Sequence, residues 1–319
     1  MTETETGDEL IDRRRKVPIR TKLLFAFGTL QEATVTAGGI VTMLFYNQVL
    51  GVSPALAGLA YLIVSIVDAV ADPVVGLWSD RFQSRWGRRH PFMFFSAFPI
   101  AIGFYFLYQP INGLSETGLV VWLVIFFAVV RLGQTFYLIP HDALGAELTN
   151  DYDDRTSIFG YNNVAEMILS MVTVAILYLL IFPTVEEGKN GLLNEAGYVV
   201  MAWTGSITIM FSVLLTTLST LDQLPYMRKL ENSQKFLSRG YFAEIRTLLS
   251  NPSYLAACLS MLIMMIGLGI IAQVATYAYI YAFKLSSEQM FWASVAKTPG
   301  IFIALPLLYY LSKHFEKKQ

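Results

Sequence analysis

Residues 68–92 read DAVADPVVGLWSDRFQSRWGRRHPF, and this stretch decides the fold. Its first part, with Asp68 and Asp72, belongs to an apolar run over 54–79 that is long enough to cross a bilayer, which takes about 20 apolar residues. A short polar segment with several arginines follows, and a second apolar run covers 91–109. Two membrane-crossing helices joined by a tight basic loop predict an all-α polytopic membrane protein.

The composition of the whole chain points the same way. Of its 319 residues, 55% are hydrophobic and only 15% are charged, whereas about a quarter of a soluble domain is charged. Lipid must therefore cover much of the surface. The net charge of −1 gives no basis for nucleic-acid binding. The single cysteine, Cys258, excludes a disulfide framework and a cysteine-rich metal site.

The sequence gives no indication of an enzyme. It contains no HExxH, no GxSxG and no P-loop motif, and its three histidines, His90, His141 and His314, are too scattered to predict a site. We therefore expect no catalytic residues, no cofactor and no metal other than a possible Na+.

Apolar runs recur along the chain and predict eight crossings. These are 23–50, 54–79, 91–109, 118–145, 157–183, 197–221, 253–283 and 287–312. Lys and Arg collect in the loops on one side, which in membrane proteins is the cytoplasmic side. With the N-terminus inside, the outer loops hold only Lys189 and Lys284. We predict an integral protein of a bacterial cytoplasmic (inner) membrane with both ends of the chain inside.

The crossings divide the chain into five parts. These are a cytoplasmic tail (1–22), a six-helix bundle (23–222), a cytoplasmic connector (223–252), two further helices (253–312) and a cytoplasmic end (313–319).

Asp68 and Asp72 are the predicted site of a coupling cation. Four residues apart on a helix, they share one face and lie one turn from each other. Two carboxylates in that position repel each other, so a cation must offset them or one must hold a proton. Thr135 of another helix could add a hydroxyl ligand, and Pro73 frees a backbone carbonyl. The alternative is an internal ion pair with Arg131.

Other polar residues inside the predicted crossings are expected to line a cavity, because a charge in the bilayer core is costly. Glu32 lies on a polar face of the first crossing, beside Gln31. Glu166 follows Asn162 and Asn163 by about one turn. For Glu166, contact with a substrate and an internal pair with Arg131 remain equally open.

The basic loop of the opening stretch predicts a conformational latch at the cytoplasmic side. Its arginines can pair with Asp80 and with acids at neighbouring helix ends, in a network that holds one conformation and releases in the other. The alternative is ordinary anchoring by positive charges. The predicted members are Gly76, Asp80, Arg81, Arg85, Gly87, Arg88 and Arg89.

Residues 68–92 resemble the second-to-third helix loop of the major facilitator superfamily. More narrowly, DAVADP and SRWGRRHPF resemble the glycoside-pentoside-hexuronide:cation symporters, the group of the melibiose permeases. FYNQVLGVSPALAG at 45–58, IPHDALGAEL at 139–148 and DRTSIFGYNNV at 154–164 are also similar to that family. The resemblance covers about residues 20–312.

The resemblance implies cation-coupled symport of a sugar or glycoside by alternating access between two helix bundles. It implies that Asp68, Asp72 and Thr135 bind Na+ or a proton and that Glu32 binds the sugar. Leu138, Asn163 and Ser65 depart from the charged residues of the melibiose permeases, so we expect a different substrate. We assign substrate contacts to Glu32, Arg131, Asp142, Asn163 and Glu166, with Asp142 and Arg131 as replacements for the missing groups.

The resemblance also implies a missing part. Eight crossings make one complete six-helix half and two helices of a second half, so we expect a C-terminally truncated chain. Three alternatives to a sugar symporter stay open: a lipid or lysolipid carrier of the same fold, a fragment that does not transport, and a membrane sensor.

Overall fold

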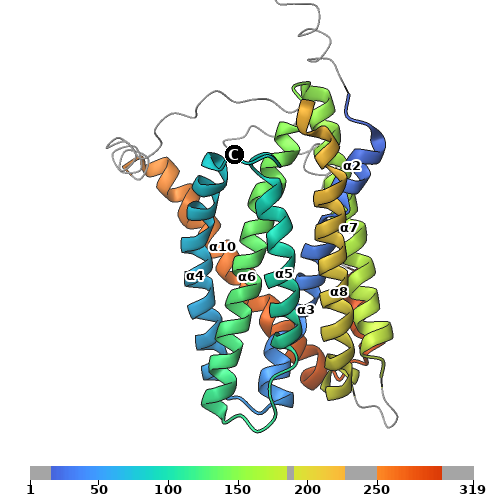
Figure 1. Ribbon diagram of the computed structural model, residues 1–319. Coiled ribbons are helices and arrows are strands. Elements are labelled where there is room, and N and C mark those ends of the chain that lie inside the picture. The colour runs from blue at the N-terminus through green and yellow to red at the C-terminus, as the bar shows by residue number, and fades with distance from the viewer. Residues whose placement is uncertain (1–15, 185–189, 227–249, 297–319) are drawn as a thin grey trace, which may run out of the picture.

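The computed structural model describes residues 16–184, 190–226 and 250–296, and within these ranges every regular element is helical (Figure 1). The long helices are α4 (Pro54–Arg81), α5 (His90–Leu107), α6 (Glu116–Glu147), α7 (Tyr152–Ala175), α8 (Glu195–Ser219) and α10 (Pro252–Tyr277). Six helical stretches in this part of the chain are long and apolar enough to cross a membrane. The prediction of an all-α polytopic protein is confirmed.

The first predicted crossing, 23–50, is not one of these six stretches. It consists of α2 (Ile19–Ala26), a break at Phe27 and Gly28, α3 (Thr29–Leu44) and the π turn η1 (Phe45–Val49). At the break, a Cβ on Gly28 would lie 2.1 Å from the Tyr137 hydroxyl of α6. The polar residues of α3 lower its hydropathy as well. Of the eighth predicted crossing, 287–312, only the part up to residue 296 is described, and it contains α11 (Ser287–Val295).

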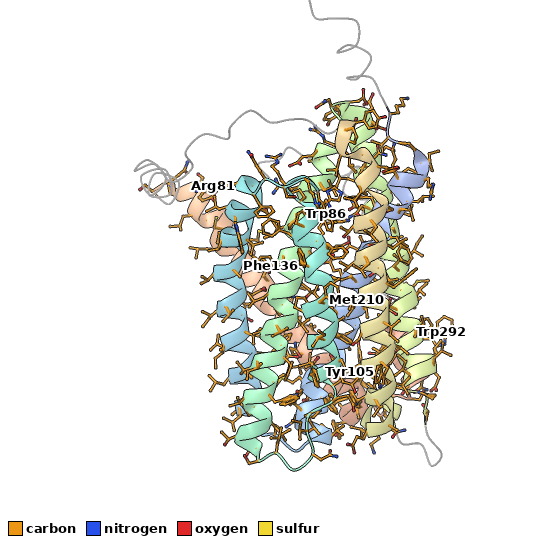
Figure 2. All side chains as sticks on the ribbon, in the orientation of Figure 1. Arg81, Trp86, Tyr105, Phe136, Met210 and Trp292 are labelled. Atoms are coloured by element: carbon orange, nitrogen blue, oxygen red, sulfur yellow. The ribbon has the colours of Figure 1, made fainter. Side chains whose placement is uncertain are left out.

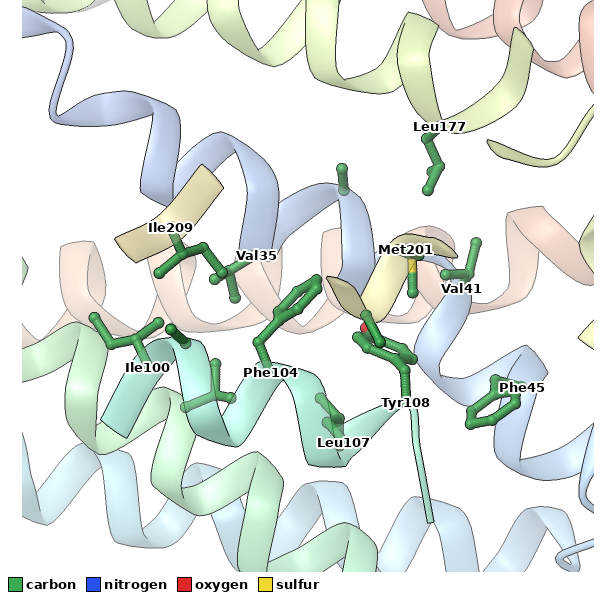
Figure 3. Packing of buried hydrophobic residues seen from close by; sticks show 14 of the residues in the cluster. Val35, Val41, Phe45, Ile100, Phe104, Leu107, Tyr108, Leu177, Met201 and Ile209 are labelled. Carbon is green, nitrogen blue, oxygen red and sulfur yellow. The ribbon is translucent and has the colours of Figure 1, made fainter. Parts of the chain in front are cut away.

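The core of the bundle lies where α5 packs against α6 and α8, while α3 packs against α7 and α8 and α4 against α6. Its buried side chains come from α3, α5, α6 and α8 and from the π turns η1 and η2 (Ile176–Ile181), and Figure 3 shows part of this cluster. They include Val35, Ile100, Phe104, Met201 and Ile209.

Small residues allow these helices to approach closely. A Cβ on Gly133 of α6 would lie 3.2 Å from the Ile100 backbone nitrogen of α5, and one on Gly205 of α8 would lie 2.3 Å from the Phe104 ring. The two glycines therefore set the distances from α5 to its two neighbours.

Two ends of the bundle can be told apart by charge. One end, at the top of Figure 1, is called the charged end here because it holds the Lys22–Asp154 ion pair and the network of Asp80, Arg89 and Glu147. The other is called the far end, and it holds the turns after η1, after α5 and after the π turn η2 (Ile176–Ile181).

The elements after residue 250 repeat the geometry of the first two crossings. The π turn η6 (Ala278–Ala282) follows α10 as η1 follows α3, and α11 follows η6 as α4 follows η1. The first residues of the corresponding elements are 233 positions apart in both cases. A residue with positive φ lies at the same place in each copy, Gly51 at 78° and Lys284 at 51°. The hydrogen bond that closes the turn recurs too, from Val52 to Tyr46 at 2.9 Å and from Leu285 to Tyr279 at 2.8 Å.

The second copy touches the first bundle mainly at the far end. In Figure 1, α10 runs obliquely behind the upright helices, and nearly all of its described residues are exposed. Its Tyr277 hydroxyl donates to the Met43 carbonyl oxygen at 3.2 Å, and the Tyr281 hydroxyl hydrogen-bonds Gln48. Among the described residues, the hydrogen bonds from α10 and η6 to the first bundle therefore gather at one end.

A second set of hydrogen bonds joins α11 to the turn after η2, and we call it the Glu288 network. The Glu288 carboxylate accepts from the Thr184 amide at 3.0 Å and from the Thr184 hydroxyl at 2.6 Å. The buried Ser287 hydroxyl accepts from the Gly191 amide at 3.1 Å and donates to Asn190 Oδ1 at 3.2 Å. The Asn190 side-chain amide also donates to the Leu285 carbonyl oxygen at 2.9 Å.

Candidate cation and substrate site

The packing of α4 on α6 brings Asp68, Asp72 and Thr135 together. The Thr135 hydroxyl lies 2.9 Å from Asp72 Oδ1 and 3.3 Å from Asp68 Oδ1. Its third neighbour is the Arg131 carbonyl oxygen at 3.2 Å. Because Asp68 and Asp72 are one helical turn apart, one hydroxyl on the facing helix reaches both carboxylates. The three residues that the sequence groups as a cation site are therefore adjacent in space.

Arg131 binds one of these carboxylates directly. Its Nε donates to Asp68 Oδ2 at 3.1 Å, and its Nη2 contacts the same oxygen. Its Nη1 donates to Gln134 Oε1 at 3.3 Å. The ion pair that the sequence left as an alternative to a cation site is thus present, and it involves Asp68 alone. Asp72 has no ion pair within the described residues.

The oxygens at this position suit a hard monovalent cation. Two carboxylates, a hydroxyl and the Arg131 carbonyl supply the kind of oxygen ligand that such ions take. Among the described residues, no group of three or more His, Cys, Asp or Glu side chains is arranged to hold a metal ion. The two carboxylates and the Arg131 guanidinium together have a formal net charge of −1. One added cation or proton would therefore make the cluster neutral.

The acids expected to bind substrate form a second group. Glu32 of α3 interacts electrostatically with Glu166 of α7, with Asp142 and His141 of α6, and with Arg131. Glu32 and Glu166 are half-buried, whereas the Asp142 side chain is 68% exposed. Within the described residues Glu166 has no ion pair with Arg131. Arg131 pairs with Asp68 in this structure, and both roles considered for Glu166 stay predictions.

His141 joins this group, although its distance in sequence from the other histidines gave no reason to expect it. The ring is buried, stacks on Phe25 at a centroid distance of 4.0 Å, and places Nε2 3.1 Å from the Phe25 carbonyl oxygen. A carbonyl oxygen only accepts, so Nε2 carries the proton. Nδ1 lies 3.4 Å from Asp142 Oδ1. The one signal in the sequence is that His141 is next to Asp142.

Asn163, expected to contact substrate, is exposed on α7. The neighbouring Asn162 is buried, and its side-chain oxygen lacks a hydrogen-bond partner. Within the described residues, Asn162 therefore has an unused acceptor inside the bundle, whereas Asn163 is accessible from outside the protein.

The latch expected at the charged end has a defined centre in Arg89. This buried guanidinium contacts Asp80 at 2.5 Å, Glu147 at 3.0 Å and the Ser79 hydroxyl at 2.8 Å. Arg88 adds a second bond to Glu147 at 3.0 Å. The network therefore ties the ends of α4, α5 and α6 together.

Other members of the predicted latch lie outside this network. Arg81 and Arg85 are exposed and have no ion pair in the described part of the chain. Gly87 adopts a φ of +77°. This left-handed conformation is costly for other residues, which explains why a glycine occupies this position. A Cβ on Gly76 would meet only Ile139, at 3.8 Å, so α4 makes no unusually close helix contact at this predicted member of the latch.

One ion pair at the charged end was not expected from the sequence. Lys22 Nζ contacts Asp154 Oδ1 at 2.5 Å, and the other oxygen of Asp154 accepts from the Val17 amide at 2.8 Å. Both charged side chains are buried. This contact ties α2 to the start of α7.

Comparison with known proteins identifies the family. A family model described as MFS/sugar transport protein matches residues 25–319. The chain belongs to this family. The resemblance of residues 68–92 to the major facilitator superfamily is thereby confirmed, and so is the fold class. The members of the family are transporters, and the long apolar helices make this chain an integral membrane protein.

Three relatives illustrate the range of the family. An uncharacterized symporter of Synechocystis sp., sll1374, is 34% identical over 58% of this chain and 35% of its own length. The putative glycoside/cation symporter YagG of Escherichia coli is 30% identical over 36% of this chain and 25% of its own. Sodium-dependent lysophosphatidylcholine symporter 1 of Xenopus tropicalis is 27% identical over 51% of this chain and 31% of its own. The alignments thus span about a third or less of these relatives.

Proposed function

We propose that this protein is a cation-coupled symporter of a sugar or glycoside that works by alternating access. One observation carries the proposal: Asp68 and Asp72 share the Thr135 hydroxyl, at a place where two carboxylates and one arginine leave a single negative charge. A site with that charge favours one Na+ or one proton. The family model's description and the relatives named as symporters support the same function.

The proposed mechanism gives Arg131 a part in coupling. A cation that binds Asp68, Asp72 and Thr135 competes with the guanidinium for the Asp68 carboxylate. We propose that the displaced guanidinium then moves toward Glu32, to which its positive charge is electrostatically attracted. Cation binding would thereby change the charge at the proposed sugar site. Coupling requires only that both ligands favour the same conformation.

The proposed conformational change opens the far end and closes the charged end. Contacts between the first bundle and the elements after residue 250 collect at the far end, in the Glu288 network and around Tyr277. We propose that this end faces outward, with the N-terminus inside a cytoplasmic membrane. We also propose that residues 253–312 begin a second bundle, which the 233-residue repeat supports.

The function can be tested in proteoliposomes that contain the protein. Labelled monosaccharides and glycosides are offered with an inward Na+ gradient, with a proton gradient, or with neither. We expect uptake to follow one of the two gradients and to be lost in Asp72→Asn. Asp153→Asn, an exposed acid at the start of α7, is the matched control. Uptake that ignores both gradients would refute symport.

A second function, transport of a lysolipid, is supported by the similarity to the Xenopus symporter. The same vesicles loaded with labelled lysophosphatidylcholine would decide between the two substrates. Saturable cation and sugar binding without any flux would instead favour a sensor or a non-transporting fragment.

A further inference from the structure

An aromatic groove opens on the surface of the bundle near the charged end. It has a volume of about 310 Å³ and lies between α4, α5 and α6. Trp78 and Phe95 at its rim are 54% and 64% exposed. Phe92 and Phe136 form its floor, with parallel rings 6.1 Å apart. The one polar residue in the wall, Ser96, donates its hydroxyl to the Met93 carbonyl oxygen, so the groove offers apolar surface only.

Two arginines close in sequence to the residues of this groove have no ion pair within the described part of the chain. Arg81 is three residues after Trp78, so both are on the same side of α4. Arg85 lies over the Trp86 ring, 5.9 Å from its centroid, and Trp86 in turn packs on Phe94. Figure 2 shows Arg81 and Trp86 at the charged end and Phe136 further along the bundle.

The acids near these arginines are already neutralised. Asp80 binds Arg89, and Glu147 binds both Arg88 and Arg89. Arg81 and Arg85 therefore remain as surplus positive charge at the level where a lipid headgroup lies.

A second groove on the same molecule has no such charge. It lies between α5 and α8 and has a volume of about 480 Å³. Tyr105 and Met210, both marked in Figure 2, are in its wall together with Trp203. No Lys or Arg lines it. Both grooves are lined by apolar side chains without Lys or Arg, but the first has Arg81 next in sequence to its wall residue Phe82, so the two form a natural pair for comparison.

We propose that the first groove binds an anionic phospholipid. An acyl chain fills the aromatic groove, and the phosphate lies between Arg81 and Arg85. Arginine suits this contact because its planar guanidinium can donate two parallel hydrogen bonds to a phosphate. Basic residues beside apolar surface at the membrane interface are the usual recognition chemistry for anionic lipids. The proposal does not depend on transport.

Tryptophan fluorescence can test the proposal on the purified protein. Phosphatidylglycerol or phosphatidylcholine with brominated acyl chains, which quench nearby tryptophans, is added in detergent. The difference in emission between the unmodified protein and Trp78→Phe gives the fluorescence of Trp78, which reports the first groove. The difference for Trp203→Phe gives the fluorescence of Trp203, which reports the second groove. We expect phosphatidylglycerol to half-quench the Trp78 part at a concentration at least five-fold below that of phosphatidylcholine. The Trp203 part should respond equally to both lipids.

Arginine variants separate a lipid site from general attraction to a charged surface. Arg81→Gln with Arg85→Gln should abolish the preference for phosphatidylglycerol at Trp78, while Lys16→Gln with Arg20→Gln, two other exposed cations near the same end, should keep it. Millimolar inorganic phosphate should not compete. Equal quenching of Trp78 by both lipids, or a preference that survives in the Arg81/Arg85 variant, would overturn the proposal. The Trp203 signal shows in each case that the protein is folded.

Discussion

Arg131 controls how easily a cation can reach Asp68. Two unit charges about 4 Å apart interact by about 4 kcal/mol at an effective dielectric constant of 20. The guanidinium is 42% exposed, so solvent weakens this attraction, and a cation can displace it. In the proposed mechanism Arg131 thus competes with the cation for Asp68 and weakens its binding.

Replacing Arg131 should therefore tighten cation binding. In Arg131→Gln, Asp68 loses its positive neighbour, and we expect the apparent Na+ affinity to rise about ten-fold, equivalent to about 1.4 kcal/mol. The apparent Na+ affinity can be measured at pH 8 from the melting temperature of the purified protein at increasing NaCl concentrations, with choline chloride as the reference salt. If a proton is the coupling ion, Arg131→Gln should instead bind its proton about ten-fold more tightly, as measured by proton uptake on acidification.

Arg20→Gln, which removes an exposed cation far from Asp68 in sequence, is the control and should leave the affinity unchanged. An affinity that falls in Arg131→Gln would mean that the arginine orients the carboxylates instead of competing with the ion.

For single residues of the site, the sequence predicts that two side chains lie together when they share one face of a helix. Asp68 and Asp72 follow from the helical period, and Thr135 from the resemblance to the symporters. His141 and the Lys22–Asp154 pair could not be predicted, because each depends on how one helix packs on another. The same limit explains Arg131: the sequence allowed an ion pair or a cation site, and the structure forms the ion pair at Asp68, the carboxylate that Thr135 also contacts.

Among the helices, the contact between α5 and α6 depends on Gly133. Gly133→Val would push its side chain into the Ile100 backbone of α5, and overpacking of this kind costs about 1–3 kcal/mol. We expect a lower melting temperature by circular dichroism. Gly58→Ala in α4, where a Cβ has no neighbour within 4 Å, should be neutral or slightly stabilising. Equal effects of the two substitutions would show that close packing at Gly133 has no energetic role.

The Glu288 network should control the opening of the far end. Glu288→Gln removes the charge from two hydrogen bonds, and bonds to charged groups contribute about 1.5–3 kcal/mol each. We expect the Thr184 and Gly191 amides to exchange hydrogen for deuterium at least ten-fold faster, as measured by mass spectrometry.

Exchange in the core of α5 and α8 should stay the same. Glu195→Gln, an exposed acid at the start of α8, is the matched control and should change little. Unchanged protection of Thr184 in Glu288→Gln would show that the far end is held by other contacts.

Hydropathy predicts the elements well where a helix is uniformly apolar, as in α4 to α8. Hydropathy misses the break at Gly28 in the first crossing, because this break depends on a contact with the Tyr137 hydroxyl of another helix. It also does not show that the polar face of α3 is turned inward. The π turns η1, η2 and η6 were not predicted either, since one extra residue in a turn leaves no mark on an apolar pattern.

For the molecule as a whole, charge sets the orientation. The Arg-rich loop 82–89 at one end and the loop 108–115 at the other should lie on opposite sides of the membrane. In a Cys258→Ser background, we expect an impermeant maleimide to label Asn112→Cys in intact cells and Gln83→Cys only after permeabilisation. The reverse pattern would place the N-terminus outside.

The repeat of 233 residues has a consequence for where the electric charge of the transporter resides. Counted on along the sequence, Pro73 falls on Pro306, but Asp68 and Asp72 fall on Ile301 and Leu305. These positions lie outside the described residues, so the comparison is of sequence alone. The two copies share their turns, whereas the acids stand in the first copy alone when the sequences are compared in this way. In the proposed symport cycle, an arriving ion would therefore be met by carboxylates of the first copy and by none at the corresponding positions of the second.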